Sequence, residues 1–360
     1  MKRALIAIPA VAILFAAGCS VGPKYQKPVT PVVPAWKEAP PESFKESQGW
    51  KVGQPGDASL RSDWWTIFGD PDLNNLETQI DVSNQNLKTA EARFREARAL
   101  IRLNQSSLFP TINVAPGISA GRSSVAKTLP GGNPRFNNFT LPIDLSYEVD
   151  AWGRVRHTIE AAREEAQATA ADLETIRLSL HAELAYDYFE LRSADAQKKL
   201  LDSTVEAYRK SLELNRNLFE GGAAAGADVA QAETQLESTQ TLDTDIGVQR
   251  AQFEHAIAVL TGKPPAALSL ALKPLNEQPP VVPGTVPSAL LERRPDIAAA
   301  ERRVAEANAE IGVARAAFFP SIVLSATAGF ESGSIADWFS WPNRLWAVGP
   351  SVLQTVFDAG

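Results

Sequence analysis

The feature that most restricts the fold is a stretch of 121 residues, between Pro142 and Pro264, that contains no proline and few glycines. Loops are normally punctuated by these two residues, so the stretch is predicted to be helical. A group of glycines within it predicts a hairpin of two helices, Arg154–Phe219 and Asp228–Thr261. At about 1.5 Å per residue, the first helix would be roughly 100 Å long. Helices of this length form coiled coils, bundles or tubes, because they are too long to fill a compact globule.

The most specific strand signal is the strict alternation of apolar and polar residues over Asn138–Asp150. The apolar residues, which fall on one face of such a strand, are Phe139, Leu141, Ile143, Leu145, Tyr147 and Val149. The other face carries acidic residues, as expected of a strand that lines a water-filled membrane barrel. A membrane strand needs about 9–11 residues, which this segment supplies. A half-buried strand of a soluble sheet has the same pattern and is the alternative.

Three further segments show weaker alternation and are also predicted to be strands, namely Thr111–Gly121, Ser321–Phe330 and Trp346–Phe357. The predicted fold is therefore mainly α-helical, with long hairpins of the coiled-coil type. Four strands per chain form a smaller transmembrane β part. Four strands cannot close a barrel with a lumen, so other subunits must complete it.

An internal duplication appears at an offset of 210 residues. Three of the four residues in Ala90–Arg93 recur in Ala300–Arg303, and Phe109-Pro110 recurs as Phe319-Pro320. Over residues 87–114 the ungapped pairing gives ten identities in 28 positions. A repeat of this length is too long for a solenoid unit, so we expect two related halves, each with a helix followed by strands.

The predicted organisation follows from the duplication and from the proline content. Asp70-Pro71-Asp72 predicts a helix start, and seven prolines in Lys263–Pro287 predict a linker between the two copies. The predicted segments are a signal peptide (1–18), a Pro-rich tether beginning at Cys19 (19–56), the first copy (57–262), the linker (263–287) and an incomplete second copy (288–360).

The first residues predict export. A short basic start precedes an apolar run, Ala4–Ala17, which is too short to cross a bilayer and is typical of a signal peptide. Ala16-Ala17-Gly18-Cys19 resembles the lipobox of bacterial lipoproteins, which implies that Cys19 is acylated and becomes the mature N-terminus. Ser20 after the cysteine implies sorting to the outer membrane. A chance cysteine at the cleavage boundary is the alternative.

Composition excludes several function classes. The net charge of −7 leaves no basic footprint for nucleic acid. One cysteine cannot build a four-cysteine zinc site, and the histidines His157, His181 and His255 are too far apart for a local metal motif. No acidic residue is tied to a base, nucleophile or ligand set. We therefore expect no catalytic residue, no cofactor and no metal site, and the chain is not predicted to be an enzyme.

The order of these features resembles the bacterial outer-membrane factor family. These are TolC-like exit ducts, and the resemblance is to the lipid-anchored, NodT-type branch in particular. The resemblance covers essentially the whole mature chain. It rests on Cys19 and the Pro-rich start, Trp65–Phe68 with Asp70 and Leu73, the two Phe-Pro entries into strands, Asp150-Ala151-Trp152-Gly153, Leu291–Asp296 and Gly349-Pro350-Ser351.

The resemblance implies a homotrimer that is anchored in the outer membrane and extends into the periplasm. Three chains would complete a twelve-stranded barrel, and their helices would form a periplasmic tube. The closed end of the tube would open when a periplasmic adaptor and an inner-membrane pump dock. Gly221, Gly222, Gly226 and Asp228 match the family's hairpin tip, where adaptors are thought to dock. In the alternative reading, the glycines only turn the chain and Asp228 is a helix N-cap.

Two other interpretations remain open at this level. A lipid-anchored periplasmic adaptor or scaffold would also have long helical hairpins, but it would lack paired amphipathic strands that recur at a fixed offset. The second copy stops at Gly360, where its own long hairpin would begin. On this ground the other alternative is that a chain of 360 residues is a fragment of such a duct, without transport activity.

Overall fold

The computed structural model describes residues 21–27, 63–122, 135–275, 280 and 293–357. The chain divides into two compact units, which are treated separately below. The strand unit comprises Met1–Val32, Arg95–Thr169 and Ala299–Gly360, and the hairpin unit comprises Val33–Phe94 and Ala170–Ala298. Each unit therefore draws on both predicted copies. The boundaries given above for the signal peptide, the tether, the two copies and the linker remain predictions.

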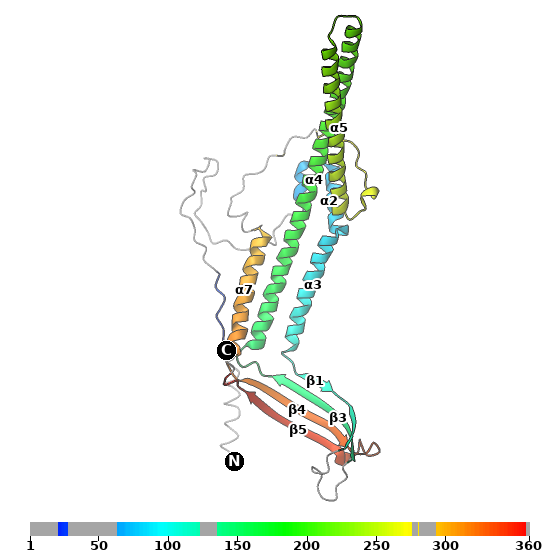
Figure 1. Cartoon of the computed structure of the whole chain (residues 1–360). Coiled ribbons are helices and arrows are strands. Elements are labelled where there is room, and N and C mark those ends of the chain that lie inside the picture. Colours follow the sequence, from blue (N-terminus) through cyan, green and yellow to red (C-terminus); the bar gives the residue numbers. More distant parts are fainter. Residues whose placement is uncertain (1–20, 28–62, 123–134, 276–279, 281–292, 358–360) are drawn as a thin grey trace, which may run out of the picture. The chain divides into compact units, whose positions relative to one another are not determined.

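Long helices dominate the described residues, as predicted (Figure 1). The α-helices are α2 (Pro71–Ser83), α3 (Gln85–Ser106), α4 (Arg154–Glu220), α5 (Gly226–Leu260) and α7 (Pro295–Ala316), and the short 3-10 helices are η3 (Trp64–Phe68), η5 (Pro265–Ala267) and η6 (Trp341–Asn343). The predicted hairpin corresponds to α4, which has 67 residues, and α5, which has 35. None of the described helices combines the length and the apolar composition needed to cross a membrane.

The strand unit contains one antiparallel sheet (Figure 1). Its strands are β1 (Thr111–Val114), β2 (Gly117–Arg122), β3 (Arg135–Glu148), β4 (Ser321–Ser332) and β5 (Arg344–Leu353). β3 pairs with β4, and β4 with β5, while β1 and β2 both pair with the other side of β3. The sheet therefore has four positions, and β3 and β4, from the two copies, lie at its centre.

Strand boundaries differ in detail from the prediction. The segment predicted as one strand, Thr111–Gly121, is divided into β1 and β2 at Ala115-Pro116, because proline has no amide to donate to the ladder. β5 begins two residues before, and ends four residues before, the predicted Trp346–Phe357. β3 ends at Glu148, but the amide of Val149 still donates to the carbonyl of Ile322 at 2.9 Å.

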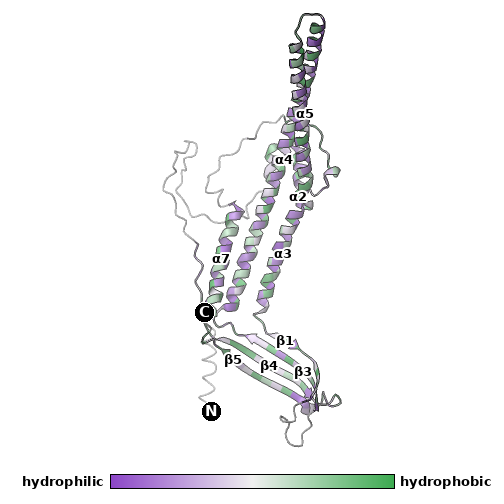
Figure 2. Ribbon diagram, in the orientation of Figure 1, coloured by the Kyte–Doolittle hydropathy of each residue, from purple (hydrophilic) through white to green (hydrophobic). Residues whose placement is uncertain are grey.

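The register gives the sheet two faces of opposite character. Residues opposite one another in register share a face, so the alternation within β3 extends across the sheet, as the coloured bands of Figure 2 show. The apolar face carries Ile112, Val114, Ile118, Phe139, Leu141, Ile143, Leu145, Tyr147, Ile322, Leu324, Ala326, Ala328, Phe330, Trp346, Val348 and Val352. On the other face Thr327 donates to Asp144 at 2.6 Å, and Asn138 to Glu331 at 2.8 Å.

The predicted duplication is visible in the element boundaries. α3 and α7 have 22 residues each and begin 210 positions apart. β4 spans the interval that corresponds to β1 and β2 together. Both helices end in the same tight turn, in which Phe109 donates its amide to Ser106 at 3.0 Å and Phe319 donates to Ala316 at 3.1 Å. The internal duplication is therefore confirmed in structure.

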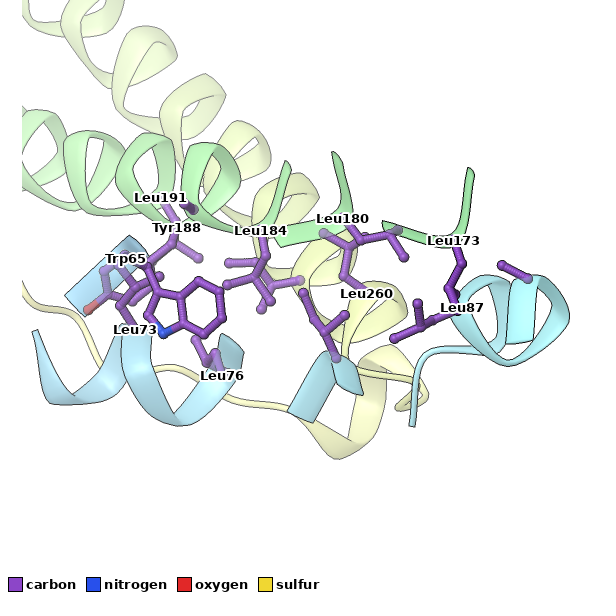
Figure 3. Packing of buried hydrophobic residues seen from close by; sticks show 14 residues of the cluster. Trp65, Leu73, Leu76, Leu87, Leu173, Leu180, Leu184, Tyr188, Leu191 and Leu260 are labelled. Atoms are coloured by element: carbon purple, nitrogen blue, oxygen red, sulfur yellow. The ribbon is translucent and has the colours of Figure 1, made fainter. Parts of the chain in front are cut away.

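The hairpin unit is held by an apolar core between α2, α4 and the end of α5 (Figure 3). Residues at spacings of three and four present one face of each helix, which is the pattern of an amphipathic helix. The fully buried residues of this core include Leu73 and Ile80 of α2, Leu184 and Tyr188 of α4, and Ile257 of α5. Burial of each such side chain contributes about 1.5–3 kcal/mol.

Replacement of a core leucine tests this packing. Leu184→Ala removes a side chain that is 0% exposed, and we expect a loss of about 2–5 kcal/mol in the free energy of unfolding. Leu200→Ala, on the same helix, is the control because Leu200 is 66% exposed. Chemical unfolding of the detergent-solubilised protein, followed by circular dichroism, measures both. Equal losses in the two variants would contradict the assigned core.

Candidate membrane face, hairpin tip and buried polar network

The apolar face of the sheet is largely uncovered in the chain. Ten large apolar side chains of the described strands are exposed, and eight of them lie on this face. These eight are Ile112, Val114, Ile118, Ile143, Leu324, Trp346, Val348 and Val352. An exposed apolar surface of this extent marks a site of interaction with a membrane or another protein.

The structure places the residues predicted for a membrane strand as follows. Phe139, Leu141, Ile143, Leu145 and Tyr147 are all in β3 and on the apolar face, and Val149 follows the last residue of the strand. They lie beside the apolar residues of β1 and β4. Their contact with lipid stays a prediction.

The turn from β3 to α4 is fixed by hydrogen bonds and ring stacking within the strand unit. The indole Nε1 of Trp152 donates to the carbonyl of Pro320 at 2.8 Å, and its ring stacks on Phe319 with centroids 4.8 Å apart. Asp150 accepts from the amides of Val155 and Arg156 at 2.9 and 3.1 Å. The Asp150-Ala151-Trp152-Gly153 motif, one of those that carry the family resemblance, therefore joins the end of β3 in the first copy to the Phe319-Pro320 turn of the second.

The hairpin tip is a Schellman turn at the end of α4. Gly222 has a φ of +75°, a conformation that side chains with a Cβ rarely adopt. Its amide donates to the carbonyl of Phe219 at 2.9 Å, and the amide of Ala223 donates to Leu218 at 2.8 Å. The glycine at position 222 is therefore required by the turn itself.

The other three predicted tip residues have different surroundings. Gly221 and Gly226 have no positive φ, and a Cβ at either would meet nothing closer than 3.4 Å. Asp228 is not the N-cap of α5, which is Ala225. Its carboxylate accepts from the Ala225 amide at 3.0 Å, three residues upstream. The turn therefore explains Gly222 and Asp228, but it does not require glycine at 221 or 226.

A buried tyrosine and aspartate join α2 to α4. Asp70 caps α2, as the Asp70-Pro71 motif predicts, by accepting from the amides of Asp72 and Leu73 at 2.8 and 3.3 Å. Tyr188 donates its hydroxyl to the same carboxylate at 2.6 Å. Burial opposes ionisation of Asp70, but these hydrogen bonds outweigh it and lower the pKa of the carboxyl. Burial and the bond to Asp70 raise the pKa of Tyr188.

A second buried carboxylate, Asp195 of α4, fastens the chain that follows α5. It accepts from Arg250 Nε at 2.6 Å, from Arg192 at 3.2 Å and from the amide of Lys273 at 3.0 Å. Arg250 also donates to the carbonyl of Leu270 at 2.6 Å. Part of the predicted linker is thus held against the hairpin by charge-assisted hydrogen bonds.

A third buried polar pair lies between α2 and α4. His181 Nδ1 lies 2.7 Å from Glu77 Oε2, and Trp65 stacks on the imidazole at 4.3 Å between centroids. Glu77 is fully buried, and burial raises the pKa of its carboxyl, against the opposing effect of His181. The sequence did not predict these three networks, because the residues that bond to one another lie far apart in the chain. The only local signal was the helix start at Asp70.

In the part of the chain that the structure describes, no group of three or more His, Cys, Asp or Glu side chains is placed to hold a metal ion. Cys19, the predicted lipidation site, lies outside the described residues.

A two-faced antiparallel sheet, a long helical hairpin and an internal duplication together define the class of outer-membrane channel proteins with an α-helical barrel. Residues 78–263 and 286–360 match the family described as Outer membrane efflux protein. The chain belongs to this family.

Named relatives and a solved structure agree with the assignment. The chain is 34% identical to the toluene efflux pump outer membrane protein TtgF of Pseudomonas putida, over 95% of this chain and 71% of that protein. It is 30% identical to the cation efflux system protein CusC of Escherichia coli O6:H1, over 98% of this chain and 74% of the relative. The outer-membrane channel OprN superposes with a TM-score of 0.78 at 32% identity, over 93% of this chain and 73% of OprN.

A buried carboxyl on α4 predicts a pH-dependent stability. Burial, with Glu183 and Glu190 nearby, raises the pKa of Asp187 to about 6. The folded state therefore binds this proton more tightly than the unfolded state does, and stability falls as the pH rises from about 4 to about 6. We expect Asp187→Asn to stabilise the protein by on the order of 1–2 kcal/mol at pH 8 and to have little effect below pH 4.

Thermal unfolding of the detergent-solubilised protein at the two pH values measures this effect. Glu213→Gln is the control, since Glu213 is an exposed acid of the same helix. A stabilisation by Asp187→Asn that is equal at both pH values would contradict the burial of a titrating carboxylate.

Proposed function

We propose that this chain is the outer-membrane exit channel of a tripartite efflux system. In this role it is a passive conduit opened by docking of a periplasmic adaptor and an inner-membrane pump. The observation that carries the proposal is the two-faced sheet, apolar on one side and polar on the other, in a chain of long helices. An adaptor or scaffold built from helical hairpins would lack such a sheet. The family and its named relatives support the same assignment.

The sheet also supports a homotrimer. β5 and the β1–β2 side are edges, which have no strand partner among the described residues. Within a bilayer each unpaired backbone group costs several kcal/mol, so the edges must pair with other subunits. Four positions per chain and three chains give twelve strands, which is wide enough for an aqueous lumen. The apolar face would then meet lipid and the polar face would line the lumen.

The conduit itself needs no chemistry. Asp144 and Glu331 lie on the polar face, so an acidic lining would bias which ions enter the lumen. Energy for export would come from the pump. The relatives bear the names of toluene and cation systems, and this breadth supports a duct whose cargo is chosen elsewhere. We therefore assign no catalytic role to any residue.

The hairpin tip is the proposed docking site for the adaptor. Gly222 and Asp228 have structural roles in the turn. They therefore support docking only indirectly, because they set the conformation of the tip. Gly221 and Gly226 are both exposed and have no conformational need for glycine. Absence of side chains there leaves backbone accessible to a partner helix, which makes these two the stronger candidates for direct contact.

A pair of neighbouring substitutions on β3 tests the membrane assignment. Leu145→Arg places a charge on the apolar face, and Ser146→Arg places the same charge on the polar face. An arginine that faces lipid costs about 2–4 kcal/mol at the bilayer centre. We expect Leu145→Arg to remove most of the heat-modifiable trimer from outer-membrane fractions. Ser146→Arg would insert normally and shift ion selectivity in planar bilayers. Equal insertion of the two variants would refute the orientation of the sheet.

Acylation of Cys19 is a separate proposal that rests on Ala16-Ala17-Gly18 before it. We expect mass spectrometry of the mature N-terminus to find residues 1–18 removed and fatty acyl chains on Cys19, which anchor the chain stably when several are present. Cys19→Ser is the matched variant and should lack these masses. An unmodified Cys19 in the mature protein would refute the proposal.

A further inference from the structure

The first described segment, Val21–Lys27, lies two residues beyond the predicted lipidation site. It belongs to the strand unit, together with the start of α4 and most of α7. The sequence predicts a Pro-rich tether here, yet this part makes specific contacts along its length.

Two hydrogen bonds hold the backbone of the segment. The amide of Val21 donates to the carbonyl of Trp152, in the turn before α4, at 3.1 Å. The side-chain amide of Asn308, on α7, donates to the carbonyl of Pro23 at 3.2 Å. The segment is therefore tied to α7 and to the turn that begins α4.

Between these two bonds the segment packs closely against a histidine. A Cβ on Gly22 would lie 2.8 Å from His157 Nε2 and 3.0 Å from the Gly312 Cα. A Cβ on Gly312 would lie 2.7 Å from the same imidazole, at Cδ2. Real Cβ atoms do not approach other atoms so closely, so His157 of α4 fits between two glycines, one on the segment and one on α7.

The far end of the segment is held by charge. Lys27 Nζ lies 3.3 Å from Glu301 Oε2 of α7, and the Tyr25 hydroxyl lies 3.5 Å from Oε1 of the same carboxylate. The side chains of Lys24, Gln26 and Lys27 are exposed to solvent, whereas Val21, Gly22, Pro23 and Tyr25 are partly buried. The segment is thus partly covered from Val21 to Tyr25, and at its end only the Lys27 ammonium group reaches back to α7.

We propose that Val21–Lys27 is an anchor strap, which fastens the lipid-bearing end of the chain across the seam between α4 and α7. The glycine–histidine–glycine contact gives the strap its fixed position, and the bonds to Trp152, Asn308 and Glu301 hold it along α7.

The strap has a consequence for the membrane anchor, and this consequence rests on the proposed acylation of Cys19. Two residues of chain reach at most about 7 Å, so Cys19 must stay within that distance of Val21. Val21 is bonded to the turn where β3 ends and α4 begins. Acyl chains on Cys19 would therefore start two residues from a point that is bonded to this turn.

A spin label on the strap measures whether it is held. Lys24→Cys places the label at an exposed position, and the electron paramagnetic resonance spectrum of the full chain in vesicles of outer-membrane lipid reports its mobility. We expect an immobilised spectrum. Asn308→Ala, Glu301→Gln and Gly312→Ala should each raise the mobile fraction about five- to tenfold, since each removes or displaces a contact that holds the segment.

Matched controls separate this effect from general loosening. Gly247→Ala adds the same methyl group to helix α5, where a Cβ would meet nothing within 4 Å. Glu96→Gln removes an exposed acid from helix α3 of the same unit, away from the strap contacts. Neither should change the spectrum, and circular dichroism should show unchanged helix content in all five variants. A label that is fully mobile in the parent, or a Gly247→Ala effect equal to that of Gly312→Ala, would overturn the strap.

The same measurement in a Cys19→Ser background separates the strap from the anchor. We expect the label to be immobilised with or without acyl chains, because the proposed contacts are all within the protein. Immobilisation only in the acylated protein would overturn the strap, since the membrane would then be what holds the segment. An unmodified Cys19 in the parent protein would refute acylation, and the Cys19→Ser background, in which position 24 is the one cysteine, would still report on the strap.

Discussion

The register between β3 and β4 is the constraint on which the strand unit depends. Ten residue pairs, from Phe139 with Ser332 to Glu148 with Val323, join the last strand of the first copy to the first strand of the second. Because side chains alternate with a period of two, a slip of one residue would turn every apolar side chain of one strand to the polar face. Asp144 and Thr327, bonded at 2.6 Å on the polar face, oppose such a slip.

The two edges of this sheet explain why a single chain, even with both copies of the repeat, needs neighbouring subunits. A soluble protein can leave an edge strand in water, but a strand in a bilayer has no solvent to satisfy its amides and carbonyls. The duplication doubles the number of strands from two positions to four and still leaves both edges open among the described residues. Closure by identical neighbours is the least costly solution, because one kind of edge contact is then repeated around a ring.

Local patterns predicted much of the fold, and long-range contacts account for what they missed. The Schellman turn at Gly222 and the cap at Asp70 are set by neighbours in sequence, so the glycine group and Asp70-Pro71 revealed them. The division at Pro116 follows from one missing amide. Nothing near Asp195 in sequence indicates Arg250 or the linker, because those contacts exist only once α4 and α5 have paired. The same holds for Gly312, whose need for glycine appears only when His157 and the strap lie against it.

The seam between α4 and α7 is acidic, and the strap brings a positive charge to it. Burial and a hydrogen bond with Glu165 of α4 raise the pKa of Glu306 on α7 to about 7, with Glu310 adding to the effect. Acids from both helices therefore meet there, and repulsion between them grows as the pH rises through about 7. Lys27 of the strap brings a positive charge to Glu301 on α7, little more than one turn before Glu306. The close packing of Gly22 and Gly312 against His157 is steric, so it holds the strap in addition to the charge pair between Lys27 and Glu301.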